Sequence, residues 1–353
     1  MKGKAMNVIR LAVAVVAGMA WGGAVLPAGA VSPAVIDIAS TFPGSMPILG
    51  DAAHGLARRV AQVSGGELAL AFHEPGELVP AADTVRRVAD GTIPAAWAGA
   101  GWFAPGDSAY HMFSSVPFGP GIGEYLAWLY HGGGLELARE MFHREGVHNI
   151  PCILIPPEAS GWFRKEISTV ADLRGLRMRF FGLGARVMEK LGATTYQLPP
   201  GEILPAMQQD RIDAAEFSLP SLDQPLQLYT AARFYYFPGW HQQATFFDLY
   251  VNKSLWERLP LRHQALLETA CGEAMRDSIA AGEAAQWQAM KEMQAEGVRL
   301  KRWPPAILVA FEKAWNEVVT EESAKNPNFA RVYASYAEFR ANYAIWKHFS
   351  NMQ

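Results

Sequence analysis

The segment from Pro156 to Gln243 carries the most information about this protein. It opens with Pro-Pro-Glu-Ala-Ser-Gly-Trp-Phe-Arg-Lys (156–165) and passes through Leu-Arg-Gly-Leu-Arg-Met-Arg-Phe-Phe-Gly (173–182) and Asp-Ala-Ala-Glu-Phe (213–217). It closes with Phe-Pro-Gly-Trp-His-Gln-Gln (237–243). The segment places an arginine at the end of a short strand, two isolated glutamates among small and aromatic residues, and an aromatic-rich loop. Together these features predict a pocket for a small anion.

The composition is that of a folded protein with about two domains. Of the 353 residues, 50% are hydrophobic and 18% are charged, so the chain can bury a large core and disorder is not expected. The formal net charge is −3, and no cluster of Lys and Arg could neutralise a row of phosphates. Nucleic acid is therefore not an expected partner.

Residues 1–30 are predicted to be a secretory signal peptide. Basic residues precede an apolar run from Leu11 to Leu26, and Ala28-Gly29-Ala30 has the small-x-small pattern of a cleavage site. The alternative is a membrane anchor, but about sixteen apolar residues interrupted by glycines fall short of the roughly twenty that span a bilayer. We therefore expect cleavage near Val31 and export to the periplasm.

Cys152 and Cys271 are the only cysteines in the chain. An oxidising compartment would allow them to pair, but two cysteines far apart in sequence make no disulfide framework. Neither lies near a histidine-rich cluster that would indicate zinc. We expect both to be buried as small hydrophobic residues, and the sequence leaves their pairing open.

The first part of the chain alternates strands and helices. This order predicts a mostly parallel sheet with helices on both faces, in which ligands sit beyond the carboxyl ends of the strands. The rule places Thr41–Met46 and Gly99–Phe103 at the mouth of a cleft. The expected elements are strand Val35–Ala39, helix Leu49–Ser64, strand Leu68–Phe72, helix Ala82–Asp90 and strand Ala95–Ala98.

A second alternating set predicts a second α/β lobe, which the chain enters at Ile155 and leaves near Gly239. Phe246–Asn252 is then a return strand to the first lobe. The expected elements of the second lobe are strand Leu176–Phe181, helix Leu183–Leu191, strand Thr195–Gln197, helix Pro200–Gln209 and a strand ending at Glu216.

Beyond Pro260 the composition predicts helices. The first runs from Leu261 to Glu296, about thirty-five residues, far above the typical length, so it must span both lobes, reach a partner, or do both. Leu308–Ser323 and Asn328–Phe349 are two more helices. The resulting division is a signal peptide (1–30), lobe I (31–155 and 243–275), lobe II (156–242) and a helical region (276–353) that packs across the lobes or on a dimer partner.

Six motifs carry a family resemblance. Three of them are Gly-Trp-Phe-Arg-Lys-Glu-Ile (161–167), Asp-Leu-Arg-Gly-Leu-Arg-Met-Arg (172–179) and Asp-Ala-Ala-Glu (213–216). They resemble the DctP-type solute-binding proteins of TRAP transporters. The other three are Pro-Ile-Leu-Gly (47–50), Val-Pro-Phe-Gly-Pro (116–120) and Pro-Gly-Trp (238–240). They look closest to the branch of the family that binds 2-oxo and 2-hydroxy monocarboxylates, such as pyruvate, 2-oxobutyrate and lactate, with a metal ion.

The resemblance implies an α/β fold of the periplasmic-binding-protein type, with a ligand cleft between two lobes and a long C-terminal helix. It also implies a TRAP membrane permease as partner and a homodimer. A TRAP binding protein for a sugar acid or dicarboxylate, without metal, is the alternative. A secreted enzyme that uses Glu158 and Glu216 as an acid/base pair is less favoured, because nucleophile-elbow, zinc-protease and phosphate-loop motifs are absent.

Arg179 is the expected ligand-binding arginine. A guanidinium at a strand end offers a planar fork that matches a carboxylate. Strand alternation places Arg177 and Arg179 on the same face, so it does not indicate which of the two binds the ligand. Arg179 could equally be a surface residue like Arg174. Its match to the carboxylate-binding arginine of the family selects Arg179.

The resemblance also implies metal ligands. Glu216 and Phe217 match a family Glu-Trp pair that supplies a side-chain oxygen and a main-chain carbonyl, and Glu158 stands where the family usually carries Gln. Two carboxylates favour Ca²⁺, whereas one carboxylate with neutral oxygens could suffice for Na⁺. Gln242 replaces a residue that is often acidic in relatives, so acid gained at Glu158 would offset acid lost there. Five aromatic residues are expected to wall the pocket: Phe42, Trp102, Phe103, Phe180 and Trp240.

Overall fold

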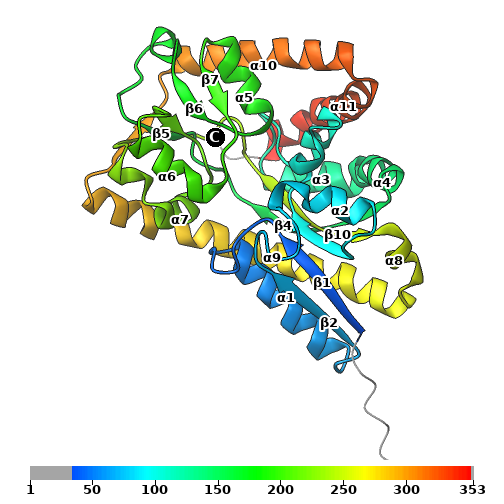
Figure 1. Ribbon diagram of the computed structural model, residues 1–353. Helices are drawn as coiled ribbons and strands as arrows, with labels where there is room; N and C mark the ends of the chain where they lie inside the picture. Colours follow the sequence, from blue (N-terminus) through cyan, green and yellow to red (C-terminus); the bar gives the residue numbers. More distant parts are fainter. Residues whose placement is uncertain (1–33, 351–353) are drawn as a thin grey trace, which may run out of the picture. The chain divides into compact units, whose positions relative to one another are not determined.

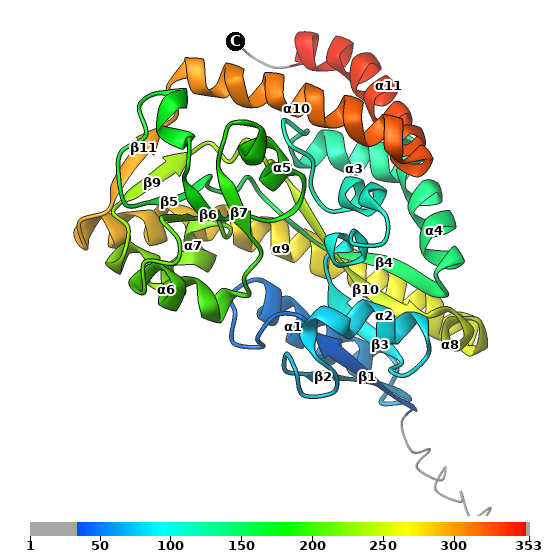
Figure 2. The ribbon, with the colours of Figure 1, turned by 45° about the horizontal axis from the view of Figure 1, so that its top comes forward.

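The computed structural model describes residues 34–350, so the predicted signal peptide lies outside the described residues. Within them no helix is both long and apolar enough to cross a membrane. Two β-sheets of mixed direction organise the chain, with helices packed around each (Figures 1 and 2). This arrangement confirms the expected α/β class with two lobes and a long C-terminal helix.

The first sheet has the strand order β2-β1-β3-β10-β4. β1 pairs parallel with β2 and β3, whereas β10 pairs antiparallel with β3 and β4. The return strand expected near residue 246 therefore runs between β3 and β4, opposite in direction to both. The strands are β1 (Ala34–Ser40), β2 (Leu68–His73), β3 (Ala95–Ala98), β4 (Val147–Ile155) and β10 (Thr245–Asn252).

Five helices accompany this sheet. The helix expected over 82–90 is shorter than predicted, because a 3₁₀ turn occupies residues 81–83. The glycine run at 132–134 separates α3 from α4, with Gly133 in the left-handed region at φ 84°. The helices are α1 (Leu49–Val63), α2 (Thr84–Ala89), α3 (Ile122–His131), α4 (Gly134–Arg144) and α8 (Lys253–Arg258).

The second sheet has the strand order β11-β9-β5-β8-β6-β7. β6 pairs parallel with β7 and β8, while β5 pairs antiparallel with β8 and β9. Its strands are β5 (Gly161–Phe163), β6 (Arg177–Arg179), β7 (Thr194–Tyr196), β8 (Ala214–Ala215), β9 (Phe234–Phe237) and β11 (Arg299–Arg302). Its helices are α5 (Gly182–Lys190), α6 (Pro200–Gln208) and α7 (Pro220–Asp223).

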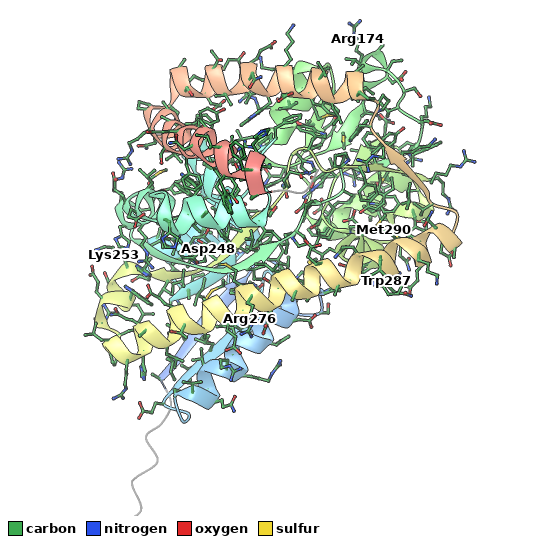
Figure 3. All side chains as sticks on the ribbon, turned by 180° about the vertical axis from the view of Figure 1, so that it is seen from behind. Arg174, Asp248, Lys253, Arg276, Trp287 and Met290 are labelled. Atoms are coloured by element: carbon green, nitrogen blue, oxygen red, sulfur yellow. A yellow bond between two sulfur atoms is a disulfide. The ribbon has the colours of Figure 1, made fainter. Side chains whose placement is uncertain are left out.

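The long helix α9 (Leu261–Ala295) packs against elements of both sheets. It contacts β4 and α1 in the first lobe and α7 in the second, and Figure 3 shows it running across the back of the molecule. The Ser278 hydroxyl hydrogen-bonds with the backbone of Leu154, while the Ser221 amide donates to Gln286 at 3.0 Å. The helix therefore braces both lobes, one of the two roles expected for it.

Gly282 lies at the point where α9 passes the start of the crossover into the second lobe. A Cβ at this position would lie 2.5 Å from Cδ of Pro156, far inside van der Waals contact. Only glycine lets the helix approach this closely.

Cys152 of β4 and Cys271 of α9 form a disulfide. Both residues are fully buried, as expected, but the prediction that they act only as small hydrophobic residues was wrong. A separation of 119 residues gives no local signal, because pairing requires the strand and the helix to be docked first.

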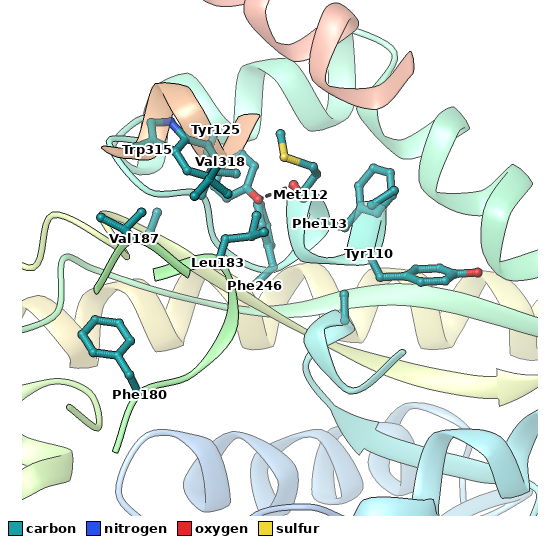
Figure 4. Close-up of a cluster of buried hydrophobic side chains, with 14 of the residues drawn as sticks. Tyr110, Met112, Phe113, Tyr125, Phe180, Leu183, Val187, Phe246, Trp315 and Val318 are labelled. Carbon is teal, nitrogen blue, oxygen red and sulfur yellow. Dashed lines mark hydrogen bonds between the residues drawn. The ribbon is translucent and has the colours of Figure 1, made fainter. Parts of the chain in front are cut away.

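A continuous hydrophobic core joins the two sheets through α10 (Pro305–Lys325) and α11 (Pro327–Ser350). α10 packs on α5, and α11 packs on α3 and α4. Figure 4 shows Leu183 and Val187 of α5 together with Phe246 of β10 and Val318 of α10. The lobes are therefore connected by apolar packing as well as by the chain crossings.

Candidate functional site

A cavity of about 430 Å³ lies between the two sheets. Thr41, Phe42, Gly99 and Trp102 line it from the carboxyl ends of β1 and β3, as the strand order predicts. The segment of the second lobe contributes Glu158, Arg179, Glu216, Phe217 and Gln242. The structure therefore gathers residues far apart in sequence around one space.

Glu158 is buried beside the cavity, three residues after the end of β4. Only 3% of its surface is exposed. Its carboxylate accepts hydrogen bonds from Ser218 Oγ at 3.3 Å and Thr245 Oγ1 at 3.4 Å. Burial, followed by the negative charge of Glu216, raises its pKa well above the ordinary value. Its charged form thus lacks a compensating cation among the described residues.

Gln242 faces the same carboxylate. Its amide satisfies the surrounding groups when the nitrogen points to Glu158, where it donates to Oε1 at 2.6 Å and Oε2 at 2.8 Å. In this orientation Glu158 and Gln242 are direct partners, so one carboxyl group and one amide share this side of the site.

Arg179 ends β6 and pairs with the second glutamate. Its Nη1 donates to the Glu216 carboxylate at 2.8 Å and to the Glu216 carbonyl at 2.6 Å, and its Nε donates to the Leu198 carbonyl at 3.2 Å. Its guanidinium lies 5.5 Å from the centre of the Phe217 ring. Among the described residues Nη2 has no hydrogen-bond partner, so it remains available to a ligand carboxylate.

Arg177 differs from Arg179 in surroundings. It pairs with Asp213 through two hydrogen bonds of 2.9 and 2.7 Å, and its side chain is 42% exposed. It does not line the cavity. The geometry thus separates the two arginines that alternation alone placed on the same face.

His241 completes the cluster and was not among the expected site residues. Its Nε2 lies 3.3 Å from Glu216 Oε1 and 3.9 Å from Glu158 Oε2. Atoms of the three residues that could bind a metal all lie within 4.8 Å of one another, and all three residues are buried. The only sequence signal was its place in the Gly-Trp-His-Gln loop, because a lone histidine has no metal-binding spacing.

The donor set fits a cation. Glu216 Oε1 and both ring nitrogens of His241 are buried without a hydrogen-bond partner in the described structure, and buried polar atoms normally have one. Arg179 pairs with Glu216 and not with Glu158, so ionisation of both buried carboxyl groups requires a further positive charge. Carboxylate oxygens are the ligands that hard cations such as Ca²⁺ prefer.

Three of the expected aromatic residues do not line the cavity. Phe103 packs against Tyr110, Phe142 and Tyr250 at ring-centre distances of 5.0–5.2 Å. Phe180 is buried against Trp240 at 5.9 Å, and Trp240 stacks on Phe311 at 4.5 Å. These large rings build the core behind the site.

Phe181 and Phe247 line the cavity instead, together with Ser218, Leu198 and Thr245. Phe181 follows Arg179 by two residues, and its backbone is still extended at φ −115° and ψ 151°. Alternate residues of an extended chain share a face. Alternation from Arg179 therefore predicts Phe181 rather than Phe180 as the cavity residue.

A cleft between two α/β lobes, with an arginine and buried carboxylates on its wall, defines a solute-binding protein for small anions. The chain belongs to the DctP family: residues 39–326 match the model described as bacterial extracellular solute-binding protein, family 7. This is a family of transport proteins, not of enzymes.

Relatives and solved structures agree with this assignment. The chain is 35% identical, over 83% of its length and 81% of the relative, to a monocarboxylate 2-oxoacid-binding periplasmic protein of Nostoc sp.. A TRAP transporter solute-binding protein from Bordetella bronchiseptica, a dimer with calcium and picolinate in its site, superposes with a TM-score of 0.86 at 33% identity, covering 89% of this chain and 94% of that chain. A protein from Pseudoalteromonas atlantica with sodium and pyruvate gives 0.86 at 30% identity, covering 90% and 97%.

Proposed function

We propose that the protein captures a small 2-oxo or 2-hydroxy monocarboxylate together with a bound cation. The observation that carries the proposal is the buried pairing of Arg179 with Glu216 beside a second carboxylate, Glu158. The 2-oxoacid-binding relative and the two structures that hold a carboxylate with calcium or sodium support it.

Each polar group has a role in this proposal. The free Nη2 of Arg179 donates to the ligand carboxylate, and Glu216 holds the guanidinium in place. Glu158, Glu216 and the carbonyl of Phe217 hold the cation, which supplies positive charge to the 2-oxo or 2-hydroxy oxygen. With two carboxylates in the set, we expect Ca²⁺ to bind more tightly than Na⁺.

Delivery to the membrane permease of a TRAP system follows from the same proposal. We assign residues 31–155 and 243–275 to lobe I, 156–242 to lobe II and 276–353 to the connecting helical region, from which β11 adds an edge strand to the second sheet. Residues 1–30 would direct export to the periplasm. Ligand binding favours the closed arrangement of the lobes only to the extent that the ligand binds that arrangement more tightly than the open one.

A homodimer is part of the proposal. The last turns of α11 expose Ile345 (65%), Trp346 (63%) and Phe349 (80%), and large apolar side chains gathered on one exposed segment are typical of an interaction surface. A second copy of the chain would cover them.

A ligand screen with matched arginine variants tests the function. Pyruvate, lactate, a sugar acid and a dicarboxylate are titrated calorimetrically in EDTA, Na⁺ or Ca²⁺. We expect the monocarboxylates to bind only with a cation, Arg179→Ala to abolish binding, and Arg177→Ala to leave it unchanged because Arg177 lies outside the cavity. Cation-independent binding of only the sugar acid or dicarboxylate would support the metal-free alternative.

A further inference from the structure

The cavity is larger and more apolar than a three-carbon acid requires. Its volume of about 430 Å³ lies in the range of pockets that enclose drug-sized ligands. Besides the polar groups already described, five large aromatic side chains line it, all of them only half-buried: Phe42, Trp102, Phe181, Phe217 and Phe247.

Two backbone segments lead from the polar groups to this aromatic wall. Arg179 is followed on the same face by Phe181, and Thr245, which contacts Glu158, is followed on the same face of β10 by Phe247. Two residues of extended chain span about 7 Å. Phe181 and Phe247 therefore lie along the cavity wall from the two polar groups, where the side chain of a ligand held by Arg179 would extend.

Four of the five aromatic rings form two pairs. Phe42 meets Phe247 edge-on at 5.2 Å between ring centres, and Trp102 lies 6.2 Å from Phe181. Both pairs leave surface facing the cavity. Such walls bind apolar and especially aromatic groups, because they bury area and offer ring faces and edges.

Closer approach of the lobes at this wall would not remove the space. Trp102 of the first lobe already meets Phe181 of the second, and a Cβ on Gly101 would lie 2.7 Å from the Phe181 ring. The backbone of one lobe thus touches the aromatic side chain of the other. The cavity is therefore the space that is left when the two lobes are already in contact at this wall.

Apolar side chains make up most of the aromatic wall. The Thr41 hydroxyl donates to the Trp97 carbonyl at 3.1 Å, so it is already engaged. Ser114 and Gln197 are further polar side chains on the cavity lining.

We infer that the cavity selects 2-oxo or 2-hydroxy acids with a bulky apolar side chain, aromatic or branched alkyl, over pyruvate and lactate. This inference rests on the proposed function. The carboxylate and the neighbouring oxygen occupy the Arg179 and cation groups, and the side chain fills the space between Phe181 and Phe247.

Calorimetric titration of the purified protein in Ca²⁺ tests the inference. The probes are pyruvate, 4-methyl-2-oxopentanoate and phenylpyruvate. We expect the two bulky acids to bind at least tenfold more tightly than pyruvate. Equal or tighter binding of pyruvate would overturn the inference and leave the proposed function standing. If no acid binds with any cation, the proposed function itself fails.

A space-filling variant locates the side-chain site. Gly99 lines the cavity, and a Cβ there would lie 3.4 Å from the Phe247 ring, so Gly99→Leu should weaken phenylpyruvate at least tenfold while changing pyruvate less than twofold. The matched control is Ala295→Leu at the exposed end of α9, which should change neither affinity. An equal loss for both acids in Gly99→Leu, or no loss for either, would contradict the assignment; thermal unfolding of both variants checks that they are folded.

Discussion

Two carboxyl groups and one guanidinium share the buried floor of the cavity. Arg179 pairs with Glu216, whereas Glu158 has only neutral donors. An ionised carboxylate without a counter-charge is costly to bury, and burial accordingly raises the pKa of Glu158. A bound cation would supply the missing positive charge and displace the proton, which couples metal affinity to the stability of the metal-free protein.

Replacing Glu158 by Gln separates these two effects. Glu158→Gln removes a carboxyl group whose buried charged form is disfavoured. Near neutral pH, where the unfolded glutamate is ionised, the metal-free protein should therefore become more stable to heat, while Ca²⁺ affinity should fall roughly tenfold because one charged ligand is lost. Thermal unfolding in EDTA and across a Ca²⁺ titration measures both. The control is Glu166→Gln, whose carboxylate pairs with Lys301 at the surface. A lower melting temperature in EDTA would contradict the electrostatic argument.

Asp248 gives a pH dependence away from the site. It is 2% exposed, receives a hydrogen bond from Asn149 at 3.0 Å, and burial raises its pKa from 3.8 to about 7. Between these values the unfolded carboxyl has lost its proton while the folded one keeps it. Rising pH therefore lowers the free energy of unfolding, by about 1.4 kcal/mol per pH unit, until the folded group also ionises near pH 7.

Asp248→Asn should remove this dependence. The stability advantage of the variant over wild type should grow from pH 4 to pH 7 and then stay level, as measured by urea unfolding at several pH values. A difference that does not vary with pH would show that the folded carboxyl titrates like the unfolded one.

At the scale of elements, the composition of long segments predicted their helices. α9 was expected over residues 261–296 and spans 261–295, because a long run without proline that is rich in Ala, Glu, Gln and Met favours a helix. β5, β9 and β11 were missed. They have three or four residues each, too few for alternation to be recognised, and they form because neighbouring strands supply hydrogen-bond partners.

The site shows the same limit. Glu158, Arg179, Glu216 and Phe217 were identified through family motifs, and the cavity brings them together. His241 was missed because its closeness to Glu216 depends on how the loop between β9 and β10 folds. Some aromatic residues were assigned to the cavity wrongly for a similar reason. Core and cavity both contain large aromatic side chains, and only the direction in which each side chain leaves the backbone distinguishes the two environments.

The disulfide between β4 and α9 should contribute substantially to stability. In the chain-entropy account, closing a loop of more than one hundred residues stabilises by about 4–5 kcal/mol, and removal of native disulfides typically costs about 2–5 kcal/mol. The double variant Cys152→Ala/Cys271→Ala should lose stability in this range by urea unfolding. Since neither cysteine lines the cavity, ligand affinity at low temperature should change little; a large loss of affinity would show that the bond also positions the site.

At the scale of the whole molecule, the exposed apolar end of α11 predicts self-association. Trp346→Glu should shift a dimer to monomer, because a charge placed in an apolar interface must be desolvated. Light scattering after size-exclusion chromatography measures the mass. Leu261→Glu, at an 80% exposed position at the start of α9, is the control and should remain dimeric. A wild-type protein that is already a monomer at micromolar concentration would refute the dimer.

The Cys152–Cys271 bond also makes maturation depend on the compartment in which the chain folds. Thiols stay reduced in the cytosol and oxidise outside it. A chain retained in the cytosol would therefore lack the disulfide between β4 and α9, and its free energy of unfolding would be lower. Such a chain is easier to keep unfolded for passage across a membrane, and oxidation after passage then makes folding hard to reverse. For the same reason, recombinant protein made in a reducing cytosol would have a lower free energy of unfolding than the disulfide-bonded protein.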